Sequence, residues 1–171
     1  MNYSKIANTY MDMIVYMILN DMYSRFDNLL KNFTSLQKIE IIGDSYMIVG
    51  DLNKKHKSDI IIKEILQLAE DLIIETKNVK APSYKLEIRI GIHIGSAVIG
   101  ILGKEKPRLC VIGNTVNIAA RLQTNTFSDT IQISEKLYNK ILDDDIKIKF
   151  TKKENVDLKN ICSMKTYVTN I

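Results

Sequence analysis

The sequence predicts an α+β domain, because segments with the periodicity of helices alternate with short apolar segments that have the alternation of β-strands. The 171 residues are enough for one domain with its own core. Hydrophobic residues make up 46% of the chain and charged residues 26%, which is ordinary for a soluble globular protein. We see no internal repeat and no low-complexity linker, so we expect a single domain over residues 1–171.

The first half of the chain is expected to hold a helix, a hairpin and a second helix. Apolar residues at helical spacing predict a helix over about residues 4–33. Two short apolar segments about a Gly-Asp turn predict a hairpin over residues 38–50, since glycine before aspartate suits a tight turn that needs a positive φ. A buried stripe with helical spacing follows, and Ser58 or Asp59 could cap that helix.

The second half is expected to be rich in strands. An alternating strand over residues 85–95 should pair with an antiparallel strand over residues 96–102. Ser134 is a candidate N-cap for the last helix. The other expected elements are a strand over 109–112, helices over 114–124 and 134–142, and strands at 131–133, 147–150 and 165–169.

Charge and cysteine content exclude several classes of protein. The net charge is +4, and the basic residues are scattered, which does not indicate a nucleic-acid-binding surface but is compatible with a nucleotide triphosphate ligand. Cys110 and Cys162 form neither a disulfide framework nor a metal-ligand cluster, so a reducing, cytosolic compartment fits best. No secretory leader and no apolar run of about 20 residues is present, so we expect any membrane anchor to lie outside this chain.

The predicted hairpin carries two acidic residues, Glu40 within its first strand and Asp44 at its turn. A carboxylate at a hairpin tip can hold a divalent metal, and a glutamate that faces inward can accept hydrogen bonds from a ligand. Asp44 could instead be a plain turn residue, because aspartate is common in turns. Glu40 could lie on a polar surface, with Ile39 and Ile41 pointing inward.

A second candidate segment runs from a strand into a helix over residues 107–122. Asn117 and Arg121 are four positions apart, so they share one face of the predicted helix. An amide can orient a hydroxyl group, and a guanidinium can stabilise a phosphoryl group as charge develops on it. Arg121 could instead be a solvated helix charge, and Cys110 could be a small buried hydrophobic residue.

Two other features are expected to be structural. Gly91, Gly95, Gly100 and Gly103 lack the spacing of a phosphate-binding loop and lie between strands, so we interpret them as strand bends and sites of close packing. His93 lies in an apolar strand and is interpreted as a core or hairpin histidine.

Taken together, the two candidate segments resemble the catalytic domain of class III nucleotide cyclases, most closely that of guanylate cyclases. The resemblance extends over nearly the whole chain, through residues 13–27, 38–50, 89–95, 110–121 and 164–168. It implies a ferredoxin-like cyclase homology domain, with an antiparallel-rich sheet and helices on one face.

The resemblance also implies roles for the hairpin residues and for Cys110. Glu40 and Cys110 match the pair that reads the purine, where adenylate cyclases usually carry lysine and aspartate. A carboxylate can accept hydrogen bonds from N1–H and the exocyclic amine of guanine, whereas lysine would face those donors badly. Asp44 matches the second of two aspartates that bind Mg²⁺ or Mn²⁺, with two ions expected.

Three further roles follow from the same resemblance. Asn117 matches an amide that orients the ribose, and Arg121 matches an arginine that stabilises the transition state. Lys159 matches a lysine that meets the triphosphate tail. The expected reaction is that of a phosphorus–oxygen lyase, which converts GTP to cGMP and pyrophosphate in intracellular signalling.

The family's site lies between two catalytic domains, so the resemblance implies a homodimer or a heterodimer with a sister cyclase domain. The expected location is the cytoplasm, either as a separate protein or as a domain of a larger membrane-anchored protein. Two alternatives stay open: an adenylate cyclase that converts ATP to cAMP, and a non-catalytic partner domain that completes a heterodimeric site.

The sequence departs from the family pattern at two places. Residues 1–4 align with the stretch that follows the first metal aspartate, so we expect the first strand and that aspartate to be absent from this chain. Residues 159–162 read Lys-Asn-Ile-Cys and lack both glycines and the second lysine of the family's loop, which leaves the role of Lys159 open.

Overall fold

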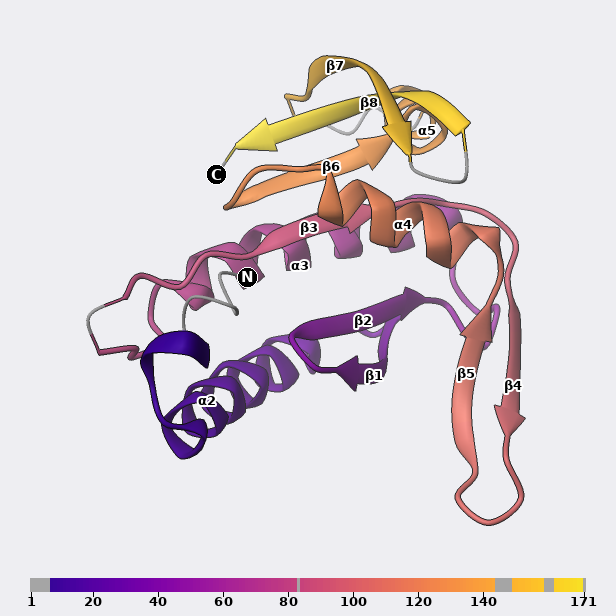
Figure 1. Ribbon diagram of the computed structural model, residues 1–171. Helices are drawn as coiled ribbons and strands as arrows, with labels where there is room; N and C mark the ends of the chain where they lie inside the picture. The colour runs from indigo at the N-terminus through magenta and orange to yellow at the C-terminus, as the bar shows by residue number, and fades with distance from the viewer. Residues whose placement is uncertain (1–6, 83, 144–148, 159–161, 171) are drawn as a thin grey trace. The chain divides into compact units, whose positions relative to one another are not determined.

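The computed structural model describes residues 7–82, 84–143, 149–158 and 162–170. The chain folds into two compact units, an N-terminal unit that ends at Ile88 and a C-terminal unit, Arg89–Asn170, and each is described by itself. Figure 1 shows helices and strands in both units, which confirms the predicted α+β class.

The N-terminal unit contains α2 (Asp12–Leu30), β1 (Leu36–Ile42), β2 (Ser45–Gly50) and α3 (Ser58–Thr76). The predicted hairpin is confirmed, because β1 and β2 pair in antiparallel fashion. The single helix expected over residues 4–33 is wrong in its extent: residues 7–9 are helical, the chain then breaks at positions 10 and 11, and α2 begins at Asp12. Hydrophobic periodicity runs through the break and therefore does not reveal it.

Apolar stripes hold the N-terminal unit together, since α2 and α3 pack against each other and against β1. The predicted stripe of α3 is confirmed, with Leu66 and Ile73 fully buried. The predicted cap of α3 is wrong: Lys57 occupies the N-cap position and makes no side-chain cap hydrogen bond, while Ser58 is already the first helical residue.

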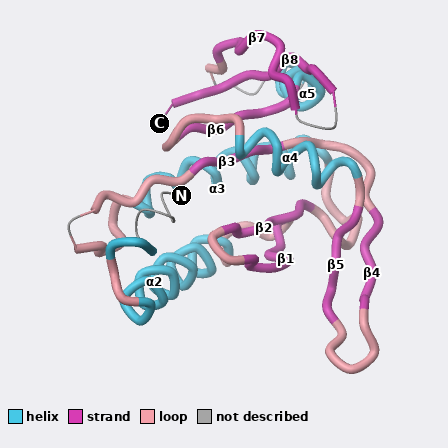
Figure 2. The backbone as a smooth tube through the Cα atoms, viewed as in Figure 1, coloured by secondary structure: helices cyan, strands magenta, loops and turns pink. Residues whose placement is uncertain are grey.

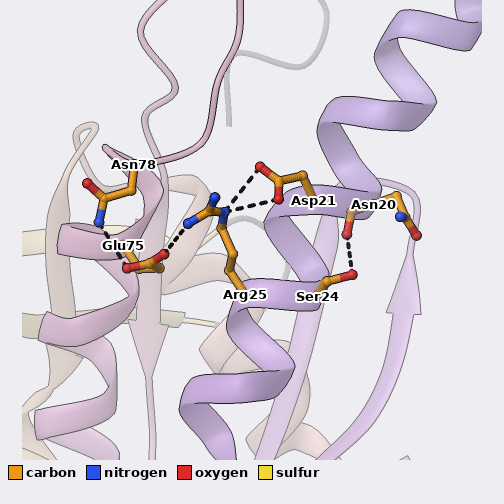
Figure 3. Close-up of polar contacts among 6 residues, drawn as sticks. All are labelled: Asn20, Asp21, Ser24, Arg25, Glu75 and Asn78. Carbon is orange, nitrogen blue, oxygen red and sulfur yellow. Dashed lines mark hydrogen bonds and ion pairs between the residues drawn. The ribbon is translucent and has the colours of Figure 1, made fainter.

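A cluster of polar side chains also joins α2 to α3 (Figure 3). Arg25 donates from Nη1 to Glu75 Oε1 at 2.7 Å and from Nε to Asp21 Oδ1 at 3.1 Å. Hydrogen bonds from Arg25 and Asn78 lower the pKa of the Glu75 carboxyl. These side chains line an open cleft of about 550 Å³ between the two helices, and none of the predicted site residues lines it.

The C-terminal unit is built on a four-stranded sheet in the order β3-β6-β8-β7. β3 and β6 pair in parallel, whereas β8 pairs in antiparallel fashion with both β6 and β7. The strands are β3 (Arg89–Ile92), β6 (Thr130–Ser134), β8 (Cys162–Asn170) and β7 (Thr151–Leu158), and the helices are α4 (Asn114–Thr124) and α5 (Glu135–Asp143).

The two helices of this unit cover opposite faces of its sheet, so the expected arrangement with helices on one face is wrong for this unit. A Cβ atom built on Gly91 of β3 would meet the backbone of α4, and Met164 of β8 packs against the buried residues of α4. Tyr167, further along β8, points to the other face of the sheet, where its ring stacks on Tyr138 of α5 with centroids 3.6 Å apart. The predicted N-cap of α5 is confirmed, because the Leu137 N–H donates to Ser134 Oγ at 3.4 Å.

A second hairpin, β4 (Val98–Leu102) with β5 (Arg108–Ile112), extends away from the four-stranded sheet of the same unit (Figure 1). The predicted pairing of residues 96–102 with 85–95 is therefore wrong, since β4 pairs with β5 and β3 pairs with the distant β6. The strand expected over 147–150 is also wrong in place: β7 begins at Thr151, and positions 144–148 lie outside the described residues.

Gly91 lies where β3 passes closest to α4. An added Cβ atom there would lie 2.3 Å from the Ala119 carbonyl oxygen and 2.3 Å from the Gln123 amide nitrogen. Both are backbone atoms and cannot rotate away, so any side chain would force α4 off the sheet. The predicted close packing is thus confirmed at Gly91, whereas it is wrong for Gly100, where nothing lies within 4 Å of an added Cβ.

We expect Gly91→Ala to lower the free energy of unfolding by about 2–3 kcal/mol, which is the usual cost of overpacking a tight contact. Urea unfolding followed by circular dichroism would measure the change. Gly100→Ala is the matched control, because its Cβ has open space, and it should change stability by less than about 0.5 kcal/mol. Equal stability of the two variants would contradict the close approach of β3 and α4.

Candidate active site

The predicted site residues fall into two sets, one in each unit. Glu40 and Asp44 lie on the β1–β2 hairpin of the N-terminal unit, while Cys110 lies on β5 and Asn117 and Arg121 lie on α4 of the C-terminal unit. Lys159 lies outside the described residues.

Asp44 lies at the exposed tip of the first hairpin. Ile42 pairs with Ser45, so Gly43 and Asp44 form a two-residue loop. Gly43 has a φ of 58°, a conformation that a residue with a side chain adopts at a cost, and this confirms the predicted positive φ. Among the described residues, none donates a hydrogen bond to the Asp44 carboxylate, which leaves both oxygens available to a ligand.

Glu40 is half-buried on β1, opposite Met47 of β2. The register shifts between Lys38 and Glu40, so Ile39 is the extra residue of a bulge and the simple alternation of sides is interrupted. Ile41 is 41% exposed, which does not fit the alternative in which the neighbours of Glu40 both point into the core. No described residue pairs with the Glu40 carboxylate.

Aromatic and charged groups of α2 hold the hairpin in place, and the sequence analysis missed them. Tyr23 donates its hydroxyl to the Gly43 carbonyl oxygen at 3.0 Å. Asp27 accepts from Tyr46 Oη at 2.5 Å and from Lys38 Nζ at 2.6 Å, so one carboxylate joins both strands to α2. Burial alone would raise the pKa of the Asp27 carboxyl, but these two hydrogen bonds and the positive charges of Lys38 and Lys31 together lower that pKa. Burial and the bond to Asp27 raise the pKa of Tyr46.

In the C-terminal unit, α4 begins directly after β5, with Gly113 between them (Figure 2). The Val116 N–H donates to the Gly113 carbonyl, and Thr115 donates its hydroxyl to the Ser96 carbonyl at 2.6 Å. The first turn of α4 is therefore tied to the segment that precedes β4. Buried Ile118 and Leu122 hold the rest of the helix against the sheet.

This packing leaves Asn117 and Arg121 one turn apart on α4, with Asn117 exposed and Arg121 half-buried. Neither side chain has a hydrogen-bond or ion-pair partner among the residues that the structure describes. Cys110 is a half-buried free cysteine on β5, and its cross-strand partner is Gly100. Because glycine has no side chain, that neighbour leaves space beside the thiol.

His93 is structural, as predicted. Its Nδ1 atom lies 2.7 Å from Ser134 Oγ, and Ser134 also caps α5. Burial lowers the pKa of His93, and the positive charge of Lys136 lowers it further. A neutral histidine with a fixed partner at the start of a helix fits a packing role.

Within the described part of the chain, no three histidine, cysteine, aspartate or glutamate side chains are grouped so as to hold a metal ion. Mg²⁺ in nucleotide enzymes commonly takes one or two carboxylates and completes its shell with substrate phosphates and water. The exposed, unpaired carboxylate of Asp44 fits such an ion as one protein ligand.

Comparison with known proteins identifies the family. The family model for the adenylate and guanylate cyclase catalytic domain matches residues 1–170. Receptor-type guanylate cyclase gcy-28 of Caenorhabditis elegans is 33% identical over 168 residues, which cover 96% of this chain and 13% of that protein. Soluble guanylate cyclase gcy-35 of the same organism is 37% identical over 120 residues, 69% of this chain and 17% of that protein. The chain thus spans a small part of these relatives.

Solved structures agree with this result. The guanylate cyclase domain of RhGC from Catenaria anguillulae, in complex with GTP, is 27% identical with a TM-score of 0.83, and the match covers 98% of this chain and 89% of that one. The adenylyl cyclase CyaB from P. aeruginosa has a TM-score of 0.86 at 19% identity, covers 99% and 89%, and supports the fold alone. None of the described helices is both long and apolar enough to span a membrane. The chain belongs to the adenylate and guanylate cyclase catalytic domain family.

Proposed function

We propose that residues 1–171 form one catalytic domain of a guanylate cyclase, which converts GTP to cGMP and pyrophosphate. The observation that carries this proposal is the unpaired state of Asn117 and Arg121 on one face of α4, in a chain whose relatives are named guanylate cyclases. Side chains that make no hydrogen bond or ion pair with the described residues are available to a substrate.

In the proposed reaction the ribose 3′-hydroxyl gives up its proton to water and its oxygen attacks the α-phosphorus of GTP. A new P–O bond forms, and the bond to the bridging oxygen breaks as pyrophosphate leaves with that electron pair. Asn117 orients the ribose for this attack, and Arg121 donates to the phosphoryl oxygens as negative charge grows on them. Asp44 would be one ligand of the two Mg²⁺ or Mn²⁺ ions, which when bound lower the pKa of the 3′-hydroxyl and neutralise phosphate charge.

Glu40 and Cys110 are proposed to select guanine. The half-buried Glu40 carboxylate has no partner among the described residues, so it can accept hydrogen bonds from N1–H and the exocyclic amine. A catalytic core of a rhodopsin-guanylyl cyclase with converted specificity, in complex with ATPαS, is 25% identical with a TM-score of 0.86. Because the specificity of that related domain could be converted, an adenylate cyclase remains the alternative within the same reaction class.

A second cyclase domain is proposed to cover the β4–β5 hairpin. Val98 is 72% exposed, Ile101 71% and Ile112 55%, so the hairpin presents a large apolar surface to solvent. Surfaces of this kind usually mark protein contacts. The guanylyl cyclase domain of the RhoGC fusion protein from Blastocladiella emersonii forms a non-canonical dimer and is 27% identical, with a TM-score of 0.79. The partner is a second copy of this chain or a sister domain.

The proposed location is the cytoplasm. The relatives include both receptor-type and soluble guanylate cyclases, so the domain fits either a membrane receptor's cytoplasmic part or a separate protein. Either setting supplies GTP and a reducing environment for the free thiol of Cys110.

The decisive test is cyclic nucleotide formation from Mn²⁺-GTP and Mn²⁺-ATP by the native full-length protein that contains residues 1–171. We expect cGMP with little cAMP. Predominant cAMP would favour the adenylate cyclase alternative. If a folded dimer forms no cyclic nucleotide from either substrate, the result would favour the alternative of a non-catalytic partner domain.

A further inference from the structure

We propose that Tyr23 is a positioning residue for the metal ligand, because its hydroxyl fixes the turn that carries Asp44. This inference rests on the proposed function in one respect, the assignment of the metal ion to Asp44. Nothing in the motif spacing indicates it, since Tyr23 lies on α2, 21 positions before Asp44 in the sequence.

The contact reaches the backbone of the turn itself. Tyr23 Oη donates to the carbonyl oxygen of Gly43 at 3.0 Å, and this carbonyl belongs to the peptide group that links Gly43 to Asp44. A rotation of that peptide plane would move the Asp44 carboxylate. The hydrogen bond therefore restrains the dihedral angles that aim the carboxylate.

The Tyr23 ring is itself held firmly. Tyr23 is only 8% exposed, and its ring stacks on that of Tyr46 with centroids 5.7 Å apart and planes 17° apart. Phe26 meets both rings edge-on, at 6.3 Å from Tyr23 and 5.6 Å from Tyr46. Asp27 holds the Tyr46 hydroxyl from the same helix. The hydroxyl that donates to Gly43 is therefore carried by a ring that is attached to α2 and packed on two sides.

A two-residue loop at an exposed tip has little else to restrain it. Metal ligands need to be held within about 0.5 Å of their productive position. Loss of a group that orients a ligand without touching the metal typically weakens metal binding by about 10–100-fold. Gly43 is an exposed residue, so water can reach its carbonyl once the hydroxyl is gone, and the same loss should change stability little.

The test compares Tyr23→Phe with wild type in the native full-length protein that contains residues 1–171. Phenylalanine keeps the stacked ring and removes only the hydroxyl. Mn²⁺ binding is followed by the electron paramagnetic resonance signal of free Mn²⁺, with 3′-deoxy-GTP present so that no turnover occurs. We expect the Kd for Mn²⁺ to rise about 10-fold, with the melting temperature nearly unchanged. Tyr16→Phe is the matched control, because Tyr16 lies on the same helix and is 64% exposed.

Asp44→Asn separates this inference from the proposed function. If Asp44→Asn binds Mn²⁺ as wild type does, the metal assignment of the proposed function is wrong. If Asp44→Asn binds weakly and Tyr23→Phe binds as wild type does, the positioning role is wrong. A Tyr23→Phe variant that loses Mn²⁺ affinity only together with a large drop in melting temperature would also overturn that role, since Tyr23 would then be needed for folding alone.

Discussion

Replacing Arg121 with alanine is expected to lower kcat by about 10²-fold or more, as the loss of a donor to a charged transition state does. The half-buried side chain makes no hydrogen bond or ion pair with any described residue, so its removal breaks no polar contact with them. Buried Ile118 and Leu122 continue to hold α4 on the sheet. The melting temperature should therefore stay close to that of wild type while activity falls.

Two further variants sharpen this test. Arg121→Lys keeps the charge but loses the planar fork that can meet two phosphoryl oxygens, so kcat should fall between wild type and Arg121→Ala. Thr124→Ala changes an exposed residue of the same helix, whose hydroxyl donates to the Arg121 carbonyl oxygen at 3.0 Å, and it should leave kcat unchanged. Wild-type kcat in Arg121→Ala would remove Arg121 from the proposed mechanism.

The local elements of the site could be predicted from the sequence because each one has a local signal. Gly43 before Asp44 marks a turn that needs a positive φ, and the structure has that φ at 58°. The i, i+4 spacing of Asn117 and Arg121 needs only a helix to place both on one face, and α4 is that helix. Signals of this kind depend only on residues that are close together in the sequence, so they can be interpreted without knowing how distant segments pack.

What could not be predicted depends on contacts between distant segments. β3 pairs with β6, about 40 positions later in the chain, and no alternation pattern within either strand specifies that partner. The hydrogen bond from Tyr23 to Gly43 crosses 20 positions. In the sequence Tyr23 falls next to the apolar stripe of its helix, beside Met22, and looks like one more core residue. Its hydroxyl reaches the Gly43 carbonyl only when α2 packs beside the hairpin, so the role of that hydroxyl cannot be inferred from the helix alone.

Combining Glu40→Lys with Cys110→Asp is expected to shift the ratio of kcat/KM for GTP to kcat/KM for ATP by about 10²-fold or more towards ATP, because sites built on buried hydrogen bonds discriminate strongly. A lysine at position 40 would face the N1–H and amine donors of guanine without an acceptor. Adenine instead presents an acceptor at N1 and a donor at its exocyclic amine, which lysine and aspartate can satisfy.

The structure indicates that both positions tolerate the change. Glu40 has no described ion-pair partner to lose, and Cys110 lies opposite Gly100, where nothing occupies the space of a Cβ atom. Each single variant leaves one half of the pair mismatched to either purine, so both singles should lose activity with GTP without gaining it with ATP. Cys110→Ser, which keeps the size of the side chain, is the control and should leave the ratio within a few-fold of wild type. A double variant that stays folded and dimeric, with an unchanged ratio, would show that other groups read the purine.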